Sequence, residues 1–152
     1  AKASANIGQS NVSSLQSYHG SRILHHEGRN YATMGDELVC SDPEEGDVIW
    51  KKKLEGDLSS SGGFLGTPPL IVTGKLIMAT LDGNVIIYDA DKGEKLEEYK
   101  AGESSRFQAV VYQGNIYVST TSGKVICIKT KDTSIDGWPT WGANNAHTNL
   151  PF

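Results

Sequence analysis

Short runs in which apolar and polar residues alternate recur along the chain from about residue 20 to residue 128. Each run is rich in Val, Ile, Leu or Tyr and is bounded by Gly, Asp, Asn or Pro. Alternation with a period of two residues between turn-forming residues predicts half-buried β-strands, whereas an amphipathic helix would show a period of about 3.6 residues. No segment sustains the helical period, so the pattern predicts an all-β fold.

The runs are organised as an internal repeat. In each copy, two predicted strands flank a glycine, and these glycines are Gly28, Gly74 and Gly114, which lie 46 and then 40 positions apart. That spacing matches the roughly 40–50 residue period of β-propeller blades. The aligned segments are residues 20–42, 66–89 and 107–128.

Further turns divide each repeat into four strands. The second turn of each repeat also contains a glycine: Gly35, Gly83 and Gly123. Two repeats then have an Asp-x-x-x-Gly turn, at residues 42–46 and 89–93, and a fourth strand at residues 47–51 and 94–99. The sequence therefore predicts two complete four-stranded antiparallel blades and most of a third.

This organisation predicts an incomplete ring. Residues 1–16 are rich in Ser, Asn, Gln and Ala and read as a flexible N-terminal segment, while residues 17–152 read as a partial propeller. Propeller rings contain roughly four to eight blades, because a single blade cannot bury both of its faces. We therefore expect the partner to be further blades, from the same protein or from a second copy. The expected blades cover residues 17–58, 64–102 and 105–152.

The repeat resembles that of the pyrroloquinoline-quinone-like, or quinoprotein, propellers. Residues 80–93 carry the pattern best, with Asp82-Gly83 before an apolar strand and Asp89 before Gly93. Trp50 supplies the tryptophan of the pattern in the first repeat, and that place falls near residues 97–98 in the second. The resemblance covers about residues 17–130 and implies a propeller fold and a periplasmic or secreted setting.

The C-terminal stretch also resembles the tails that close propellers of this type. It contains Trp138-Pro139-x-Trp141-Gly142 and then His147-Thr148. Two tryptophans among turn-forming residues suit a strand that packs across a blade edge. We expect it to finish the third blade or to lead toward ring closure.

The two cysteines occupy one repeat position, which in the second repeat holds Ile87. This equivalence predicts that Cys40 and Cys127 are both buried, free thiols. They lie two blades apart, beyond the reach of a disulfide. The adjacent-cysteine disulfide that the resemblance to quinoprotein alcohol dehydrogenases would imply has no counterpart in this sequence.

A candidate ligand site lies where each first strand begins. Alignment on the turn glycines makes Arg22, Pro68 and Gln108 equivalent. First strands lie nearest a propeller axis, so Arg22 and Gln108 are candidates to bind an anionic or polar ligand at one mouth of the channel. The competing interpretation is that they form hydrogen bonds between blades. Further candidates nearby are Arg106, Tyr18 and His19.

Composition narrows the function classes. The net charge of −4, with positive and negative residues interspersed, gives no reason to expect a nucleic-acid-binding surface. No apolar run approaches the roughly 20 residues of a membrane span. The four histidines lack metal-ligand spacing, and residues 89–94 read as a hairpin turn rather than a calcium loop.

The favoured function is a non-catalytic propeller module that binds a protein or a ligand, without a metal or cofactor. The resemblance leaves two alternatives. One is a segment of a quinone-dependent dehydrogenase, which would bring pyrroloquinoline quinone, Ca²⁺ and a stacking tryptophan. The other is a lipid-anchored scaffold of envelope assembly.

Overall fold

The computed structural model describes residues 22–61 and 63–150. These residues form β-strands and one helical turn, α1 (Leu58–Ser61). The all-β prediction is confirmed. The strands of the first two sheets are β1 (Leu24–His26), β2 (Arg29–Met34), β3 (Glu37–Ser41), β4 (Val48–Lys53), β5 (Leu70–Val72), β6 (Lys75–Ala79), β7 (Asn84–Asp89) and β8 (Lys95–Lys100). Those of the third are β9 (Val110–Tyr112), β10 (Asn115–Ser119) and β11 (Val125–Lys129).

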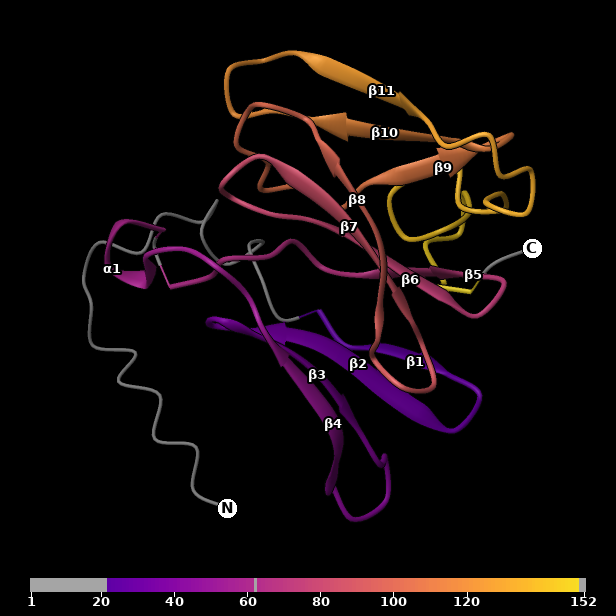
Figure 1. Cartoon of the computed structure of the whole chain (residues 1–152). Helices are drawn as coiled ribbons and strands as arrows, with labels where there is room; N and C mark the ends of the chain where they lie inside the picture. Colours follow the sequence, from indigo (N-terminus) through magenta and orange to yellow (C-terminus); the bar gives the residue numbers. More distant parts are fainter. Residues whose placement is uncertain (1–21, 62, 151–152) are drawn as a thin grey trace.

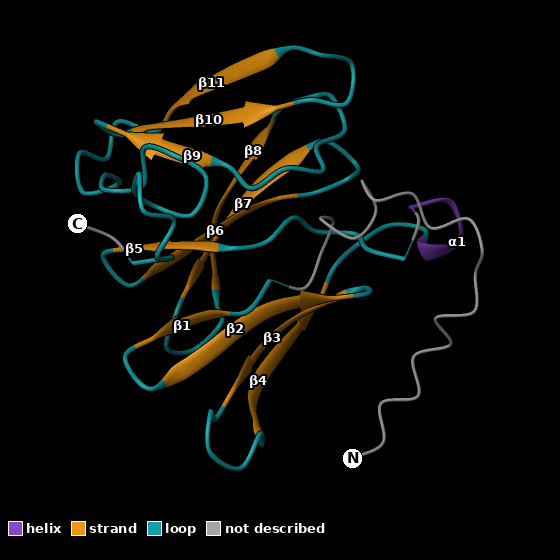
Figure 2. Cartoon of the chain, turned by 180° about the vertical axis from the view of Figure 1, so that it is seen from behind, coloured by secondary structure: helices purple, strands orange, loops and turns teal. Residues whose placement is uncertain are grey.

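The strands form three antiparallel sheets that stand side by side (Figure 1). The first two sheets have the orders β1-β2-β3-β4 and β5-β6-β7-β8, and the third has β9-β10-β11. The view from behind shows the same sequence of sheets, with β1, β5 and β9 at corresponding positions (Figure 2). This is the repeated meander of a partial propeller, and we call the sheets the first, second and third blades.

The first hairpin of each blade has the same two-residue loop. Its glycine has φ of +72° at Gly28, +72° at Gly74 and +73° at Gly114. The residue before each glycine also has positive φ, between 47° and 49°. Two successive left-handed residues make the type I′ turn that suits the twist of a hairpin. The glycines that revealed the repeat are therefore required by the turn that they form.

Adjacent blades pack through an indole at the outer rim. Trp50 on β4 donates its Nε1–H to the carbonyl oxygen of Ala90 at 3.1 Å. A Cβ atom on Gly93 would lie 2.6 Å from the Trp50 ring. The third turn of the second blade therefore needs glycine at residue 93 for its backbone conformation and also for contact with the neighbouring blade.

Glu97 of the second blade is equivalent to Trp50 of the first. Trp50 pairs with Cys40 and Glu97 pairs with Ile87, and these two partners occupy the same position in their blades. An indole at residue 97 would need a third hairpin turn in the third blade to pack against. That turn is absent from the described part of the third blade. Glu97 instead accepts a hydrogen bond from the Tyr99 hydroxyl.

The third blade ends after three strands because its third turn has a different sequence. In the first two blades the turn begins with Asp42 or Asp89, whose carboxylate accepts hydrogen bonds from backbone N–H groups of the turn. Lys129 stands at the equivalent position, since it lies opposite Asn115 as Asp89 lies opposite Lys75. A lysine has no acceptor to close such a turn.

After β11 the chain crosses to the opposite edge of the blade. Val111 on β9 donates its N–H to the carbonyl oxygen of Trp138 at 2.7 Å, and the two residues form an isolated bridge. Trp138 is fully buried. The C-terminal segment therefore joins the third blade, as expected, but along its inner strand and not as a fourth outer strand.

The two cysteines differ in burial. Cys40 is buried and Cys127 is exposed. The repeat equivalence holds, because each cysteine pairs with the corresponding residue of the second strand, Tyr31 or Tyr117. The prediction of a buried Cys127 is wrong because the second blade covers the Cys40 face, whereas the equivalent face of the third blade is uncovered among the described residues. Both thiols are free, as predicted.

Candidate functional site

Gln108, at the start of the third blade, joins three parts of the chain. Its Nε2 donates to the carbonyl oxygen of Pro69 at 2.9 Å. Its Oε1 accepts from the Trp138 indole N–H at 3.4 Å and from the Gly142 N–H at 3.1 Å. Since both acceptor sites and one donor are engaged, the carboxamide links the second blade, the third blade and the C-terminal segment.

Arg22, before the first strand of the first blade, meets the same C-terminal segment. Its guanidinium carbon lies 3.9 Å from the centre of the Trp141 ring, in cation–π geometry. His147 lies against the same indole, with ring centroids 5.8 Å apart, and its Nδ1 contacts the Trp141 carbonyl oxygen. Trp141 therefore connects the first blade to the C-terminal segment, which Gln108 fixes to the other two.

The structure thus brings together two of the predicted residues, Arg22 and Gln108, through Trp141 and Gly142. The tail motif, which contains Trp138, Trp141 and Gly142, indicated that the C-terminal segment packs on a blade. It did not indicate which residues the motif contacts. The alternative interpretation of Gln108, a hydrogen bond between blades, describes its contact with Pro69. Binding of an external ligand by Arg22 or Gln108 stays a prediction.

Arg106 is placed elsewhere. It lines a depression of about 250 Å³ together with Glu55, Asp57, Asp82 and Ser104. This depression lies beside the connection between the first and second blades, away from the contacts of Gln108. The remaining candidates, Tyr18 and His19, and the N-terminal segment 1–16 lie outside the described residues.

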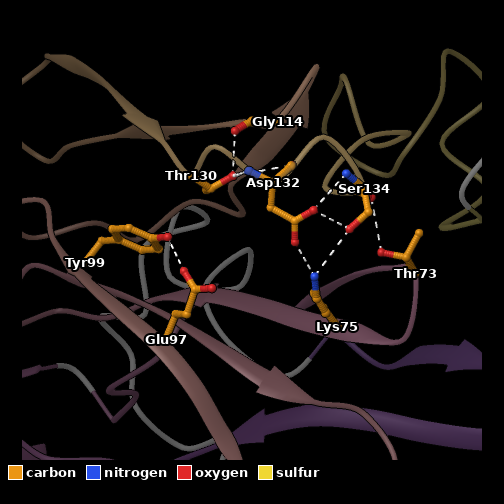
Figure 3. A network of polar contacts seen from close by, with 8 residues as sticks. All are labelled: Thr73, Lys75, Glu97, Tyr99, Gly114, Thr130, Asp132 and Ser134. Carbon is orange, nitrogen blue, oxygen red and sulfur yellow. Dashed lines mark hydrogen bonds and ion pairs between the residues drawn. The ribbon is translucent and has the colours of Figure 1, made fainter.

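A polar network holds the chain where it leaves β11 (Figure 3). The Asp132 carboxylate pairs with the ammonium group of Lys75 on β6 and accepts from the Ser134 N–H at 2.9 Å and from the Ser134 hydroxyl at 2.6 Å. Thr130 donates its hydroxyl to the Gly114 carbonyl oxygen at 2.7 Å. The hydroxyl of Thr73 donates to the Ser134 carbonyl oxygen at 3.1 Å. These bonds turn the chain toward the inner strands.

The same network strongly lowers the pKa of Asp132. Hydrogen bonds from Lys75 and Ser134 lower the pKa of Asp132 from 3.8 to about 2. Beside it in Figure 3, Tyr99 donates to Glu97. Burial, followed by this hydrogen bond to a carboxylate, raises the pKa of Tyr99 to about 12. Sequence reasoning missed both pairs. The available signal was Thr130-x-Asp132-x-Ser134 in place of the Asp-x-x-x-Gly turn.

Among the described residues, no blade packs on one face of the first blade, which we call the leading face and define by Ile23, Ala32, Met34 and Val39. These side chains line a hollow of about 240 Å³ together with Asn30 and Ser41. Ile23 is 61% exposed and Met34 is 57% exposed. In the second blade the residue equivalent to Ala32 is Met78, which is buried against the first blade. The leading face therefore carries positions that stack between blades elsewhere in the chain.

In the described part of the chain, no blade packs on the opposite face of the third blade, which we call the trailing face and define by Tyr117, Val125 and Cys127. Val125 is 70% exposed and Cys127 is exposed. The positions equivalent to Val125 in the first two blades, Leu38 and Val85, are completely buried. The same repeat position therefore changes from core to surface only because no further blade covers it here.

Among residues 22–61 and 63–150, no group of three or more His, Cys, Asp and Glu side chains could hold a metal ion. Within those ranges, no helix is long and apolar enough to cross a membrane.

All three tryptophans make contacts within the chain. Trp50 packs between blades and Trp138 is fully buried on the inner strand. One face of the Trp141 ring is covered by Arg22. Trp141 is 37% exposed. The expectation that the chain binds no pyrroloquinoline quinone therefore stays a prediction.

A family model described as outer membrane protein assembly factor BamB matches residues 5–145. Comparison with curated protein sequences gives no match.

Two solved structures illustrate the likeness in fold. BamB from Moraxella catarrhalis superposes with a TM-score of 0.60 at 16% identity, over 76% of this chain and 35% of that one. A quinohemoprotein alcohol dehydrogenase from Pseudomonas putida superposes with a TM-score of 0.63 at 18% identity, over 76% of this chain and 19% of that one. The chain thus spans about a third of the first relative and a fifth of the second.

Proposed function

The chain belongs to the family described as outer membrane protein assembly factor BamB, and on that premise we propose that it is a non-catalytic propeller module whose two open faces bind further blades. The observation that carries the proposal is the exposure of Val125, at 70%, where the equivalent Leu38 and Val85 are 0% exposed. An apolar side chain exposed at a repeat position that is buried in the other blades indicates a blade contact that is missing here.

Both faces carry blade-stacking positions, so the natural occupant of each is another blade. The leading face corresponds to the face of the second blade that packs against the first, and the trailing face corresponds to the face of the first that packs against the second. A second copy offers both surfaces in the correct orientation, as do blades elsewhere in a longer protein. The contact is head to tail, because one face type meets the other.

A quinone-dependent dehydrogenase segment is the second candidate, and it is favoured only by the likeness in fold to quinoprotein dehydrogenases. Against it stand Trp50 and Trp138, which pack within the chain. The family's description includes outer membrane assembly, and we extend a cell-envelope or exported setting to this chain as part of the proposal.

The test is the solution mass measured by light scattering over a range of concentrations. We expect association above the 16.4 kDa of the chain, and we expect Met34→Glu or Val125→Glu to abolish it by placing a charge on one face. Leu96→Glu is the matched control, because Leu96 is 47% exposed but lies on the outer strand β8. A monomer at every concentration would overturn self-association through these faces.

Mixing the two variants gives the sharper result. Met34→Glu retains an intact trailing face and Val125→Glu an intact leading face, so a head-to-tail contact returns as a dimer when they are mixed. No recovery would contradict head-to-tail stacking. A parallel sample with pyrroloquinoline quinone and Ca²⁺ tests the dehydrogenase alternative, since quinone absorbance that co-migrates with the protein would overturn the non-catalytic assignment.

A further inference from the structure

The outer strand of the third blade has an unpaired edge. In the first two blades a fourth strand pairs with the third, β4 with β3 and β8 with β7. β11 has β10 on one side, and no described strand lies on the other. The polar network around Asp132 takes the chain away from that edge, so the blade does not complete itself within the described residues.

The hydrogen-bond pattern shows which backbone groups point outward. The Thr120 N–H donates to the Lys124 carbonyl oxygen, and the Thr130 N–H donates to the Gly114 carbonyl oxygen. In an antiparallel pair bonded and non-bonded positions alternate. The N–H and C=O groups of Val125, Cys127 and Lys129 therefore face away from β10 and form a row of donors and acceptors with no strand partner among the described residues.

The other two blades show what normally occupies such a row. The N–H of Asp42 donates to the Asp47 carbonyl oxygen and that of Asp89 to the Glu94 carbonyl oxygen. Asp47 and Glu94 come directly before β4 and β8. In both complete blades an acidic residue therefore stands at the head of the fourth strand, beside the position that Lys129 holds in the third blade.

The charge at the β11 edge is opposite to that of the equivalent turns. Lys129 and Lys131 are exposed at one end of the strand. Lys124 lies at the other end, paired with Glu103. An acidic residue beside Lys129 would meet an opposite charge there. Pairing of β11 with β11 of a second copy would instead bring lysines from both chains together, which is unfavourable.

We propose that the free edge of β11 binds an extended segment of a partner polypeptide by antiparallel strand addition, with an acidic residue of that segment beside Lys129. Main-chain hydrogen bonds to residues 125, 127 and 129 hold the segment in the position of a fourth blade strand. This interaction uses the edge of the sheet, and it does not depend on the stacking of the leading and trailing faces.

The probe is a synthetic peptide with the sequence of residues 93–101, which contains the fourth strand of the second blade after its acidic head. Binding is measured by fluorescence anisotropy of the labelled peptide and by amide hydrogen exchange of the protein. With peptide at about ten times its Kd, exchange at Val125, Cys127 and Lys129 slows roughly tenfold, because exchange then requires the unbound state. Ile126 and Ile128, which already bond to β10, serve as internal controls.

Two variants test the mode of binding. Val125→Pro removes one outward N–H at an edge position where proline is tolerated, and we expect weaker peptide binding. Lys129→Glu should weaken binding too, whereas Lys92→Glu makes the same charge change on another blade and should leave it unaltered. A peptide with Glu94→Lys should bind the wild-type chain less tightly.

Each contrary result is distinct. An absence of protection at the three alternate amides would overturn the proposal. If these amides become protected without peptide as the protein concentration rises, a second copy occupies the edge. That result would also overturn the proposal of a partner polypeptide. Face stacking covers the side chains of Val125 and Cys127 but does not protect the amides of residues 125, 127 and 129. Loss of face stacking would therefore leave the peptide-dependent amide protection unchanged, which distinguishes failure of the proposed function from failure of this proposal.

Discussion

Lys75 on β6 forms an ion pair with Asp132, the residue at which the chain turns inward after β11. One contact therefore connects the second blade to the segment that follows the last strand of the third. Because Asp132 also accepts both hydrogen bonds that Ser134 offers, the carboxylate determines the course of the chain from the outer to the inner edge of the blade.

Asp132→Asn is expected to lower the free energy of unfolding near neutral pH. The pKa of Asp132 falls from 3.8 to about 2 on folding, so its ionised form stabilises the folded state. That contribution is complete above about pH 4 and is lost as the pH falls through 2. Urea denaturation at pH 7 and between pH 4 and pH 2 should show that the variant loses less stability in this window than the wild type. Glu44→Gln, at an exposed turn, is the control, and an equal acid sensitivity of wild type and Asp132→Asn would contradict the assignment.

Gly93→Ala is expected to destabilise the protein more than Gly46→Ala. Both glycines close a third hairpin with positive φ, at 66° and 77°, so each substitution costs roughly 1 kcal/mol of backbone strain. A Cβ at Gly46 meets nothing within 4 Å, whereas one at Gly93 lies 2.6 Å from Trp50. This clash adds about 1–3 kcal/mol. Thermal or urea unfolding measures the difference, and equal costs at both positions would show that the indole moves aside freely.

Trp50→Ala provides the complementary test. Loss of the indole removes packing between blades and the bond to Ala90, and we expect a loss of about 3 kcal/mol. In the Trp50→Ala background the additional penalty of Gly93→Ala over Gly46→Ala should disappear, because there is no ring left to clash with. A double-mutant cycle that finds no coupling between residues 50 and 93 would argue against their contact.

Gln108→Leu is expected to release the C-terminal segment. The change leaves the N–H groups of Trp138 and Gly142 and the carbonyl of Pro69 without their partner, at about 1–3 kcal/mol for each buried group. Gln108→Glu retains an acceptor for both N–H groups, but it replaces the donor toward the Pro69 carbonyl with a charged oxygen. Hydrogen exchange at Gly142 should therefore accelerate in Gln108→Leu and much less in Gln108→Glu. The same rate in both variants would mean that the carboxamide does not hold the segment.

Cys127 is expected to react with a thiol reagent in the folded protein, whereas Cys40 reacts only after unfolding. Cys127 is exposed, and Cys40 is buried in an environment that raises the pKa of its thiol. The thiolate is the reactive form of cysteine. Burial therefore lowers the reactivity of Cys40 in two ways, because it blocks access of the reagent and reduces the thiolate fraction. A thiol titration with and without denaturant measures this, with Cys127→Ser as the control. Two native-state thiols in the wild type would refute the difference in burial.

Much of the fold could be predicted from local signals in the sequence. The glycines at residues 28, 74 and 114 occupy turns that need positive φ, and a repeated physical requirement leaves a repeated residue. The burial of Cys127 could not be predicted in the same way, because repeat position determines which face a residue occupies and not whether another blade covers that face.

Less of the candidate site could be predicted from the sequence. Alignment placed Arg22 and Gln108 at equivalent positions near the inner strands, but their actual partners, Trp141, Trp138 and Gly142, lie in the C-terminal segment and outside the repeat. A non-repeating segment has no internal template, so its contacts depend on tertiary structure alone. The network of Lys75 and Asp132 was missed for the same reason, since residue 132 follows the last repeated strand.

The identical two-residue loops of the three first hairpins have a consequence for how the chain folds. Each joins strands only a few residues apart, so every blade begins with contacts that have a small loop-closure entropy. Proteins dominated by such local contacts fold faster than those whose strands pair over long distances. Each blade can therefore form its first hairpin before its neighbours dock.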